Sequence, residues 1–118
     1  MDILFEGLMP GLLHEVTIWS FDDGSPQTRT SDWFANGVLA FDDYTFNGTV
    51  DPTDNGMYSF SFLANADLDG SLLVTGTSRT TFSHGLFLDA IELRAIPEPT
   101  TLALLGLGAL ALVRRRRK

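Results

Sequence analysis

The sequence predicts an all-β body, an antiparallel β-sandwich, followed by one short C-terminal transmembrane helix. In residues 1–95 the apolar side chains recur with a period of two wherever a period is visible, and no segment shows the period of a helix. Gly, Asp, Asn and Pro separate these short segments, as they do in sandwich proteins. After Ile96 the pattern changes to an unbroken apolar run that ends in basic residues.

The first three expected strands each end at a strong turn signal. Val16–Phe21 ends at an Asp-Asp-Gly sequence, Gly37–Phe41 at an Asp-Asp pair, and the brief Tyr44–Phe46 at an Asn-Gly turn. Between the first two strands we expect a polar loop, residues 25–36, that begins at Ser-Pro and carries Trp33.

The next three expected strands complete the body. Met57–Ala64 alternates aromatic residues with serine, which is typical of a half-buried strand. A hairpin turn at Asp67–Gly70 then leads into Ser71–Thr77, and the last expected strand is Leu86–Ala95. Six strands with exposed edges would make an incomplete sandwich.

Length and charge exclude several classes of protein. The 118 residues are enough for one domain, and the net charge is −7. The part before Ile96 holds three basic residues against fourteen acidic ones, a net charge of −11, which argues against binding to nucleic acid. The absence of cysteine excludes disulfides, thiolate metal sites and cysteine nucleophiles.

The change at Ile96 divides the chain into a body, residues 1–95, and a tail, residues 96–118. In the tail, residues 97–99 are Pro-Glu-Pro, residues 100–113 form the expected apolar helix, and residues 114–118 are basic. The largest side chains of the expected membrane segment are Leu102, Leu104, Leu105, Leu107, Leu110, Leu112 and Val113. The basic cluster consists of Arg114, Arg115, Arg116, Arg117 and Lys118.

A membrane segment explains this tail better than a buried helix. The unbroken apolar run from Leu102 to Val113 gives about 18 Å of helix against about 30 Å of hydrocarbon. Two threonines before the run and snorkelling arginines after it bring the segment closer to spanning length. The basic cluster should stay in the cytoplasm, which places Pro97 and the body on the outer face. The alternative, a helix buried on all sides, needs a larger core than this body supplies.

Pro97, Glu98 and Pro99, followed by a short apolar helix and an arginine cluster, resemble the PEP-CTERM sorting signal of Gram-negative bacteria. The resemblance implies recognition by exosortase, a membrane protease-transpeptidase that cuts near the Pro-Glu-Pro motif. It also implies a place in the cell envelope or in an exopolysaccharide-associated matrix. The two prolines keep this stretch extended, as a protease requires.

The start of the chain does not look like the signal peptide that export requires. The first seven residues hold two acidic residues and no basic one, and Pro10 interrupts the apolar stretch that follows. We therefore expect a start further upstream, or a gene fragment that is not exported. The segments Gly7–Gly11 and Glu15–Trp19 resemble the step into a middle strand of extracellular sandwich domains, which implies upstream strands. Leu88–Leu93 is similar to the last strand of galactose-binding-like jelly rolls, the architecture of many carbohydrate-binding modules.

Two residues are candidates for ligand binding. In the jelly rolls that the body resembles, an acid on the last strand helps to bind a structural Ca²⁺, which makes Asp89 the candidate metal ligand; an exposed strand residue is the alternative. Trp33 is the candidate contact to an extracellular polysaccharide, since core packing accounts for Trp19 and Tyr58. No other cofactor is expected.

Nothing in the sequence indicates an enzyme. His14 and His84 are far apart, and each lies beside a strand start, where surface roles are common. We expect a surface protein with a structural or adhesive body; the alternatives are a carbohydrate-binding module and the unexported fragment. Its partners would be exosortase, the bilayer and a polysaccharide.

Overall fold

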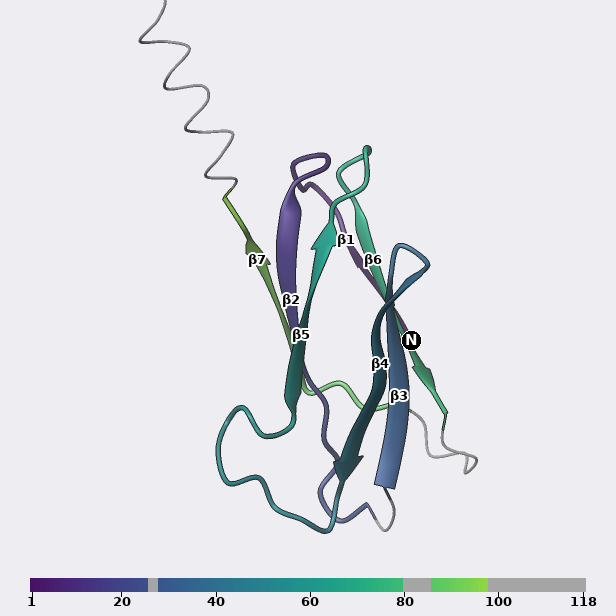
Figure 1. The fold of residues 1–118 in the computed structure, drawn as a ribbon, viewed down its shortest axis with the longest axis vertical. Coiled ribbons are helices and arrows are strands. Elements are labelled where there is room, and N and C mark those ends of the chain that lie inside the picture. Colours follow the sequence, from purple (N-terminus) through teal and green to yellow (C-terminus); the bar gives the residue numbers. More distant parts are fainter. Residues whose placement is uncertain (26–27, 80–85, 98–118) are drawn as a thin grey trace, which may run out of the picture.

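The computed structural model describes residues 1–25, 28–79 and 86–97, and within them the chain is all β, with no helix. Two antiparallel sheets face each other across one core (Figure 1). The described strands are β1 (Asp2–Phe5), β2 (Leu13–Trp19), β3 (Thr28–Ala35), β4 (Val38–Asn47), β5 (Ser59–Asn65), β6 (Leu72–Ser78) and β7 (Ala90–Ala95).

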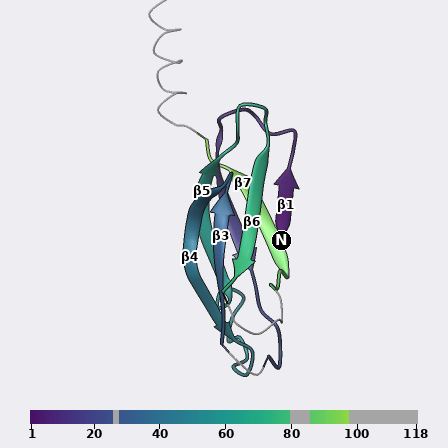
Figure 2. The same cartoon turned by 90° about the vertical axis from the view of Figure 1, so that its right-hand side faces the viewer.

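One sheet has four strands and the other three. The order in the larger sheet is β1-β6-β3-β4, and Figure 2 shows these four strands side by side. The smaller sheet has the order β5-β2-β7, so β2 is its central strand. In Figure 1 the smaller sheet lies on the left and the larger one on the right.

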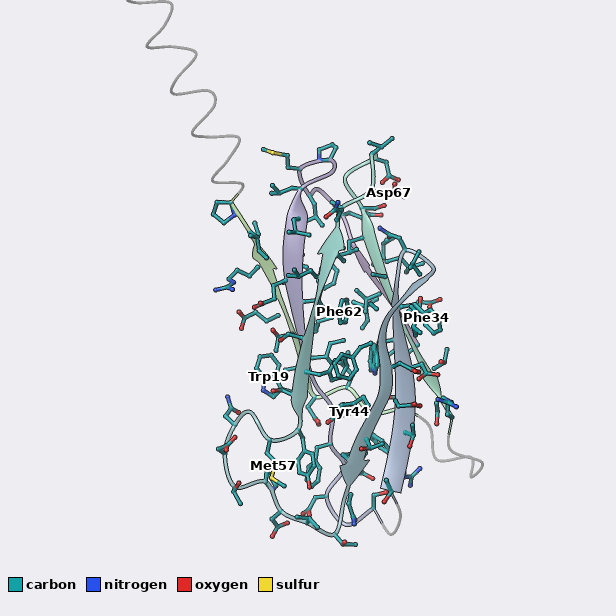
Figure 3. The ribbon with its side chains drawn as sticks, in the orientation of Figure 1. Trp19, Phe34, Tyr44, Met57, Phe62 and Asp67 are labelled. Carbon is teal, nitrogen blue, oxygen red and sulfur yellow. The ribbon has the colours of Figure 1, made fainter. Side chains whose placement is uncertain are left out.

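The core lies between the sheets and is rich in aromatic rings. The ring of Phe60 lies with its centroid 4.5 Å from that of Tyr44 and 5.6 Å from that of Trp33, so it joins the two sheets. Figure 3 shows Tyr44 and Phe62 pointing into this space. The buried core residues are Val16, Ile18, Trp33, Tyr44, Phe46, Phe60, Phe62, Ala64, Leu72 and Val74.

The predictions based on a period of two are confirmed where the inward positions are apolar. The Met57–Ala64 prediction corresponds to β5, and the Val16–Phe21 prediction corresponds to β2, with boundaries shifted by one to three residues. A turn forms at Asp67–Gly70 as predicted, but it is not a hairpin turn, because β5 and β6, which it joins, lie in different sheets. The Asp67 N–H donates to the Ser71 carbonyl at 2.7 Å, and Gly70 has a φ of 78°, which favours glycine.

The prediction of a loop over residues 25–36 is wrong, because most of this segment forms β3. Its inward positions are Arg29, Ser31 and Trp33, all of them buried. Two of these three are polar, so the alternation of β3 is invisible to a hydrophobicity pattern. Ser31 Oγ accepts a hydrogen bond from Trp33 Nε1–H at 3.0 Å, and Ser25 Oγ accepts one from Arg29 Nε–H at 2.8 Å.

The prediction of two strands at Gly37–Phe41 and Tyr44–Phe46 is also wrong, since both belong to β4. Asp42 and Asp43 do not end a strand; they lie at an irregularity where the register between β3 and β4 shifts. Asp43 has a φ of 55°, and its N–H donates to Asp32 Oδ1 at 3.0 Å. A bulge thus accommodates the acidic pair without ending the strand.

The strand predicted at Leu86–Ala95 is shorter than expected, because β7 begins at Ala90. Leu86, Phe87 and Leu88 instead pack half-buried against the core as irregular backbone. The Phe87 carbonyl accepts a hydrogen bond from Ser20 Oγ at 2.6 Å, which satisfies this backbone without a strand partner. Strand β1 was not predicted.

Within the described ranges, the structure contains no helix that could span a membrane. The predicted apolar helix, residues 100–113, and the basic cluster, residues 114–118, lie outside the described residues.

Candidate functional site

An open pocket of about 390 Å³ lies at the end of the smaller sheet, where three segments distant in the sequence meet. Trp19 is the last residue of β2 and Phe21 follows it, whereas Tyr58 comes from the loop before β5 and Asp89 from the segment before β7. The remaining lining residues are Pro52, Asp54, Asn55 and Ala90. Figure 3 shows Trp19 beside this loop, which also carries Met57.

The aromatic walls of the pocket are held in fixed orientations. Trp19 Nε1–H donates to the Asn55 carbonyl at 2.8 Å. The rings of Phe21 and Tyr58 stack at 4.4 Å between centroids, with 12° between their planes. The Tyr58 hydroxyl lies 2.6 Å from the Val50 carbonyl, its acceptor. Such constraints preorganise flat apolar surfaces for a ligand.

Polar groups lie on the rim of the same pocket. Asp89 Oδ2 accepts the Phe21 N–H at 2.7 Å, and Asp54 Oδ1 accepts the Gly56 N–H at 2.8 Å. Each carboxylate therefore has one oxygen engaged with the backbone, and both residues are exposed. A mostly apolar cleft with a few fixed acceptors is the ordinary form of a small-ligand site.

The prediction that core packing accounts for Trp19 is wrong, because Trp19 lines this pocket. For Tyr58 the prediction is confirmed, since its ring packs half-buried against the core, but Tyr58 lines the pocket as well. The parity of β2 could have found Trp19. Because Val16 and Ile18 face the core, the odd-numbered Trp19 must lie on the outer face. No sequence signal brings Tyr58 and Asp89 to the same place, since they meet only through the fold.

The prediction that Trp33 is an exposed ligand contact is wrong. Its side chain is 0% exposed and lies among the core rings, because β3 is a strand and Trp33 occupies an inward position. His14 is likewise buried at 3% exposure, and its Nδ1 lies 2.8 Å from the Leu12 carbonyl. His84 lies outside the described residues.

Asp89, the candidate calcium ligand, belongs to no group of three acids, among the described residues, whose carboxylates lie close enough to share an ion. In residues 1–25, 28–79 and 86–97, one group of three acids has carboxylates close enough to share an ion: Asp32, Asp42 and Asp43. The calcium role of Asp89 therefore stays a prediction.

The three clustered acids surround one cation. Arg79 Nε lies 3.5 Å from Asp32 Oδ2, and Arg79 Nη1 lies 3.7 Å from Asp42 Oδ1. Arg79 Nη1 also forms an ion pair with Asp43 Oδ1. The hydrogen bond from the Asp43 N–H lowers the pKa of Asp32. A hydrogen bond with Asp32, together with partial desolvation and the nearby negative charges, raises the pKa of Asp42. The exposed cluster thus has an internal counter-ion.

The sorting sequence begins directly where the body ends. The Ile96 N–H donates to the Leu13 carbonyl at 2.9 Å and continues the ladder one residue beyond β7, while Pro97 is exposed. Glu98 and Pro99 lie outside the described residues. The strand therefore fixes the backbone that immediately precedes the Pro-Glu-Pro sequence.

Comparison with known proteins confirms the sorting motif that the sequence predicts in the tail. The family model of the PEP-CTERM protein-sorting motif matches residues 95–118, and no curated protein or solved structure matches the chain. A motif of this family is recognised by exosortase, a membrane protein, and directs membrane-associated sorting to the surface or the extracellular space. The chain therefore carries a PEP-CTERM sorting motif, the mark of a protein sorted to the cell envelope.

Proposed function

We propose that this chain is a non-enzymatic surface protein of a Gram-negative-type bacterium, whose body has a structural or adhesive role in the extracellular matrix. The observation that carries the proposal is the sorting motif that begins at the last residue of β7. In this account the apolar segment holds the chain in the membrane during sorting. Exosortase then cuts near Pro97 and releases the body to the outer surface.

The position of the motif supports this sequence of events. A protease needs an extended, accessible backbone, and Pro97 is exposed just beyond the last bond of the β2–β7 ladder. A cut after this point would remove no described strand. The body would therefore keep its two sheets after the tail is removed.

Surface location can be tested with a single thiol, because the chain has no cysteine. Leu68 lies in the turn before β6 and is 87% exposed, so we expect a membrane-impermeant maleimide to label Leu68→Cys on intact cells. The matched variant Val16→Cys, whose position is fully buried, should be labelled only after unfolding. Labelling of Leu68→Cys only after cell lysis would contradict surface exposure.

A second candidate function, binding of a neutral polysaccharide, is favoured by the aromatic pocket. Flat rings such as Trp19 and Tyr58 can stack on the faces of sugar rings, and the rim carboxylates of Asp54 and Asp89 can accept hydrogen bonds from hydroxyls. The net charge of the body, −11, disfavours acidic polysaccharides. The resemblance of Leu88–Leu93 to galactose-binding-like jelly rolls supports the same candidate.

Trp19→Ala should weaken retention by neutral polysaccharides roughly tenfold or more, as truncation of a central aromatic contact does. Affinity electrophoresis through gels that contain galactan or soluble cellulose derivatives measures this effect. Leu63→Ala is the control, because Leu63 is exposed on β5 of the same sheet but does not line the pocket. Equal retention of wild type and Trp19→Ala would remove the reason for a sugar site there.

A further inference from the structure

Strand β7 lies at an edge of the three-stranded sheet, and no other described strand pairs with its outer side. The backbone groups on that side can be identified from the ladder. Ile96 donates to the Leu13 carbonyl, so the pair Leu13–Ile96 is a hydrogen-bonded one. Hydrogen-bonded and non-bonded pairs alternate in an antiparallel ladder, so Glu92 and Arg94 also bond to β2.

The bonds on the other side of β2 confirm this alternation. Ser20 N–H donates to the Tyr58 carbonyl at 3.0 Å, and Ala66 N–H donates to the Leu12 carbonyl at 2.9 Å. In β2 and its flanks, the even-numbered residues therefore direct their backbone N–H and C=O groups toward β5, and the odd-numbered residues direct theirs toward β7. It follows that Ile91, Leu93 and Ala95 direct their N–H and C=O groups to the free edge. An exposed row of this kind is a template for another strand.

The side chains of β7 follow the same parity. Ile91 and Leu93 point inward and pack half-buried against the core, whereas Glu92 and Arg94 lie exposed on the outer face. Arg94 Nη2 lies 3.2 Å from Glu15 Oε1 on β2. Glu92 has no ion-pair partner within the described part of the chain.

We propose that two copies of this chain pair through β7, antiparallel and centred on Leu93, so that the two three-stranded sheets become one continuous sheet. In this register Leu93 forms a hydrogen-bonded pair with the partner's Leu93, and Ile91 pairs with the partner's Ala95. On the outer face Glu92 lies opposite the partner's Arg94, and the same contact recurs across the two-fold axis. Arg94 then lies between two carboxylates, Glu15 of its own copy and the partner's Glu92.

Charge favours this register over the two neighbouring antiparallel registers that the backbone allows. Only odd-numbered residues of β7 direct their backbone groups to the edge, so two residues that form a hydrogen-bonded pair must both have odd numbers. The sum of the two paired residue numbers therefore changes by two from one register to the next. In the neighbouring register on one side, the two β7 strands are centred on Glu92, so Glu92 lies opposite the partner's Glu92. In the neighbouring register on the other side, Arg94 lies opposite the partner's Arg94. Both neighbouring registers place like charges directly opposite each other, which is destabilising.

Disulfide trapping tests the register in the full chain, purified in mild detergent. Glu92→Cys and Arg94→Cys are prepared separately, then mixed in equal amounts, equilibrated and oxidised with copper phenanthroline. A non-bonded pair has Cα atoms about 4.5 Å apart, within disulfide range, so the mixture should give a covalent dimer. Each variant alone should give at least about tenfold less dimer, because identical positions lie diagonally, about 7–8 Å apart.

Each result of the trapping experiment decides the proposal. Dimer in the mixture alone supports the Leu93-centred register. No dimer in any sample, or equal dimer in all three, would overturn it, since the latter indicates random collision. Ser61→Cys and Leu63→Cys, on the outer face of the opposite edge strand β5, form the matched control pair and should not crosslink when mixed.

Charge exchange provides a second, non-covalent readout by sedimentation velocity. Glu92→Arg places arginines opposite each other, and Arg94→Glu places glutamates opposite each other, so either variant alone should dimerise roughly tenfold more weakly than wild type. An equal mixture of the two restores both opposite-charge contacts and should dimerise again. A monomeric wild type at about 100 µM, or identical behaviour of all samples, would overturn the proposal, and the charges would then serve to protect an unpaired edge.

Discussion

Trp33→Ala is expected to lower the free energy of unfolding of the body by about 3–5 kcal/mol. Trp33 is fully buried between the sheets, and its Nε1–H donates to Ser31 Oγ. Truncation would leave a cavity beside Phe60. It would also remove the N–H group that donates a hydrogen bond to the buried Ser31 hydroxyl. Small domains are stable by about 5–15 kcal/mol, so this loss is a large share of the total. Urea unfolding of the full chain in mild detergent, followed by far-ultraviolet circular dichroism, measures it.

Two variants bracket this result. Trp33→Phe keeps a ring beside Phe60 and should fall between wild type and Trp33→Ala. Leu68→Ala, at an exposed turn position, should stay within about 0.5 kcal/mol of wild type. A Trp33→Ala protein as stable as Leu68→Ala would mean that Trp33 is not a core residue, and would restore it as a candidate ligand contact.

Gly48→Ala is expected to destabilise the body by about 2–3 kcal/mol. A Cβ on Gly48 would collide with the backbone of Asp22 and Ser25, and would lie 2.5 Å from Ser25 Cβ. This turn is held in place, because Gly24 N–H donates to the Gly48 carbonyl at 2.8 Å. Backbone cannot move aside as the end of a flexible side chain can.

The collision has a second consequence at Arg29, which is 6% exposed. Its Nε–H donates to Ser25 Oγ, and its guanidinium lies 5.7 Å from the centroid of the Phe87 ring. Moving Ser25 would leave this buried charge with fewer partners, which adds to the cost. Gly56→Ala is the control, since its Cβ would approach nothing closer than Asp54 Oδ1 at 3.4 Å. Equal stability of the two variants by urea unfolding would contradict the close approach.

The sequence predicts those parts of this molecule whose signals are local. β5 was predictable because Phe60 and Phe62 alternate with exposed residues, and the turn at Asp67–Gly70 because its residue types favour it. The sorting motif is local as well, and the family model finds it at residues 95–118. In each case neighbouring residues alone carry the information.

Other parts depend on contacts between distant segments. β3 hides its alternation because Arg29 and Ser31 occupy inward positions, and their hydrogen-bond partners are known only from the fold. The bulge at Asp43 depends on the carboxylate of Asp32, eleven residues earlier. Strand propensity alone cannot anticipate such compensation.

The pocket is the clearest case of this limit. Trp19, Tyr58 and Asp89 come from three segments separated by more than thirty residues each. All three residues are present in the sequence, but no sequence pattern predicts that they lie close together in the fold. Trp33 was the wrong choice among the aromatic residues because its neighbours are polar, although its own position faces the core.

The intact mass of the native protein, isolated from the envelope of its own cells, tests the sorting account most directly. We expect a body that lacks the residues after the Pro97 region, with the apolar segment and the basic cluster removed. Mapping of the C-terminal peptide would place the cut near Pro97, Glu98 and Pro99. A protein that keeps every residue through Lys118 in the envelope would contradict the account, because the motif would then be present but unused.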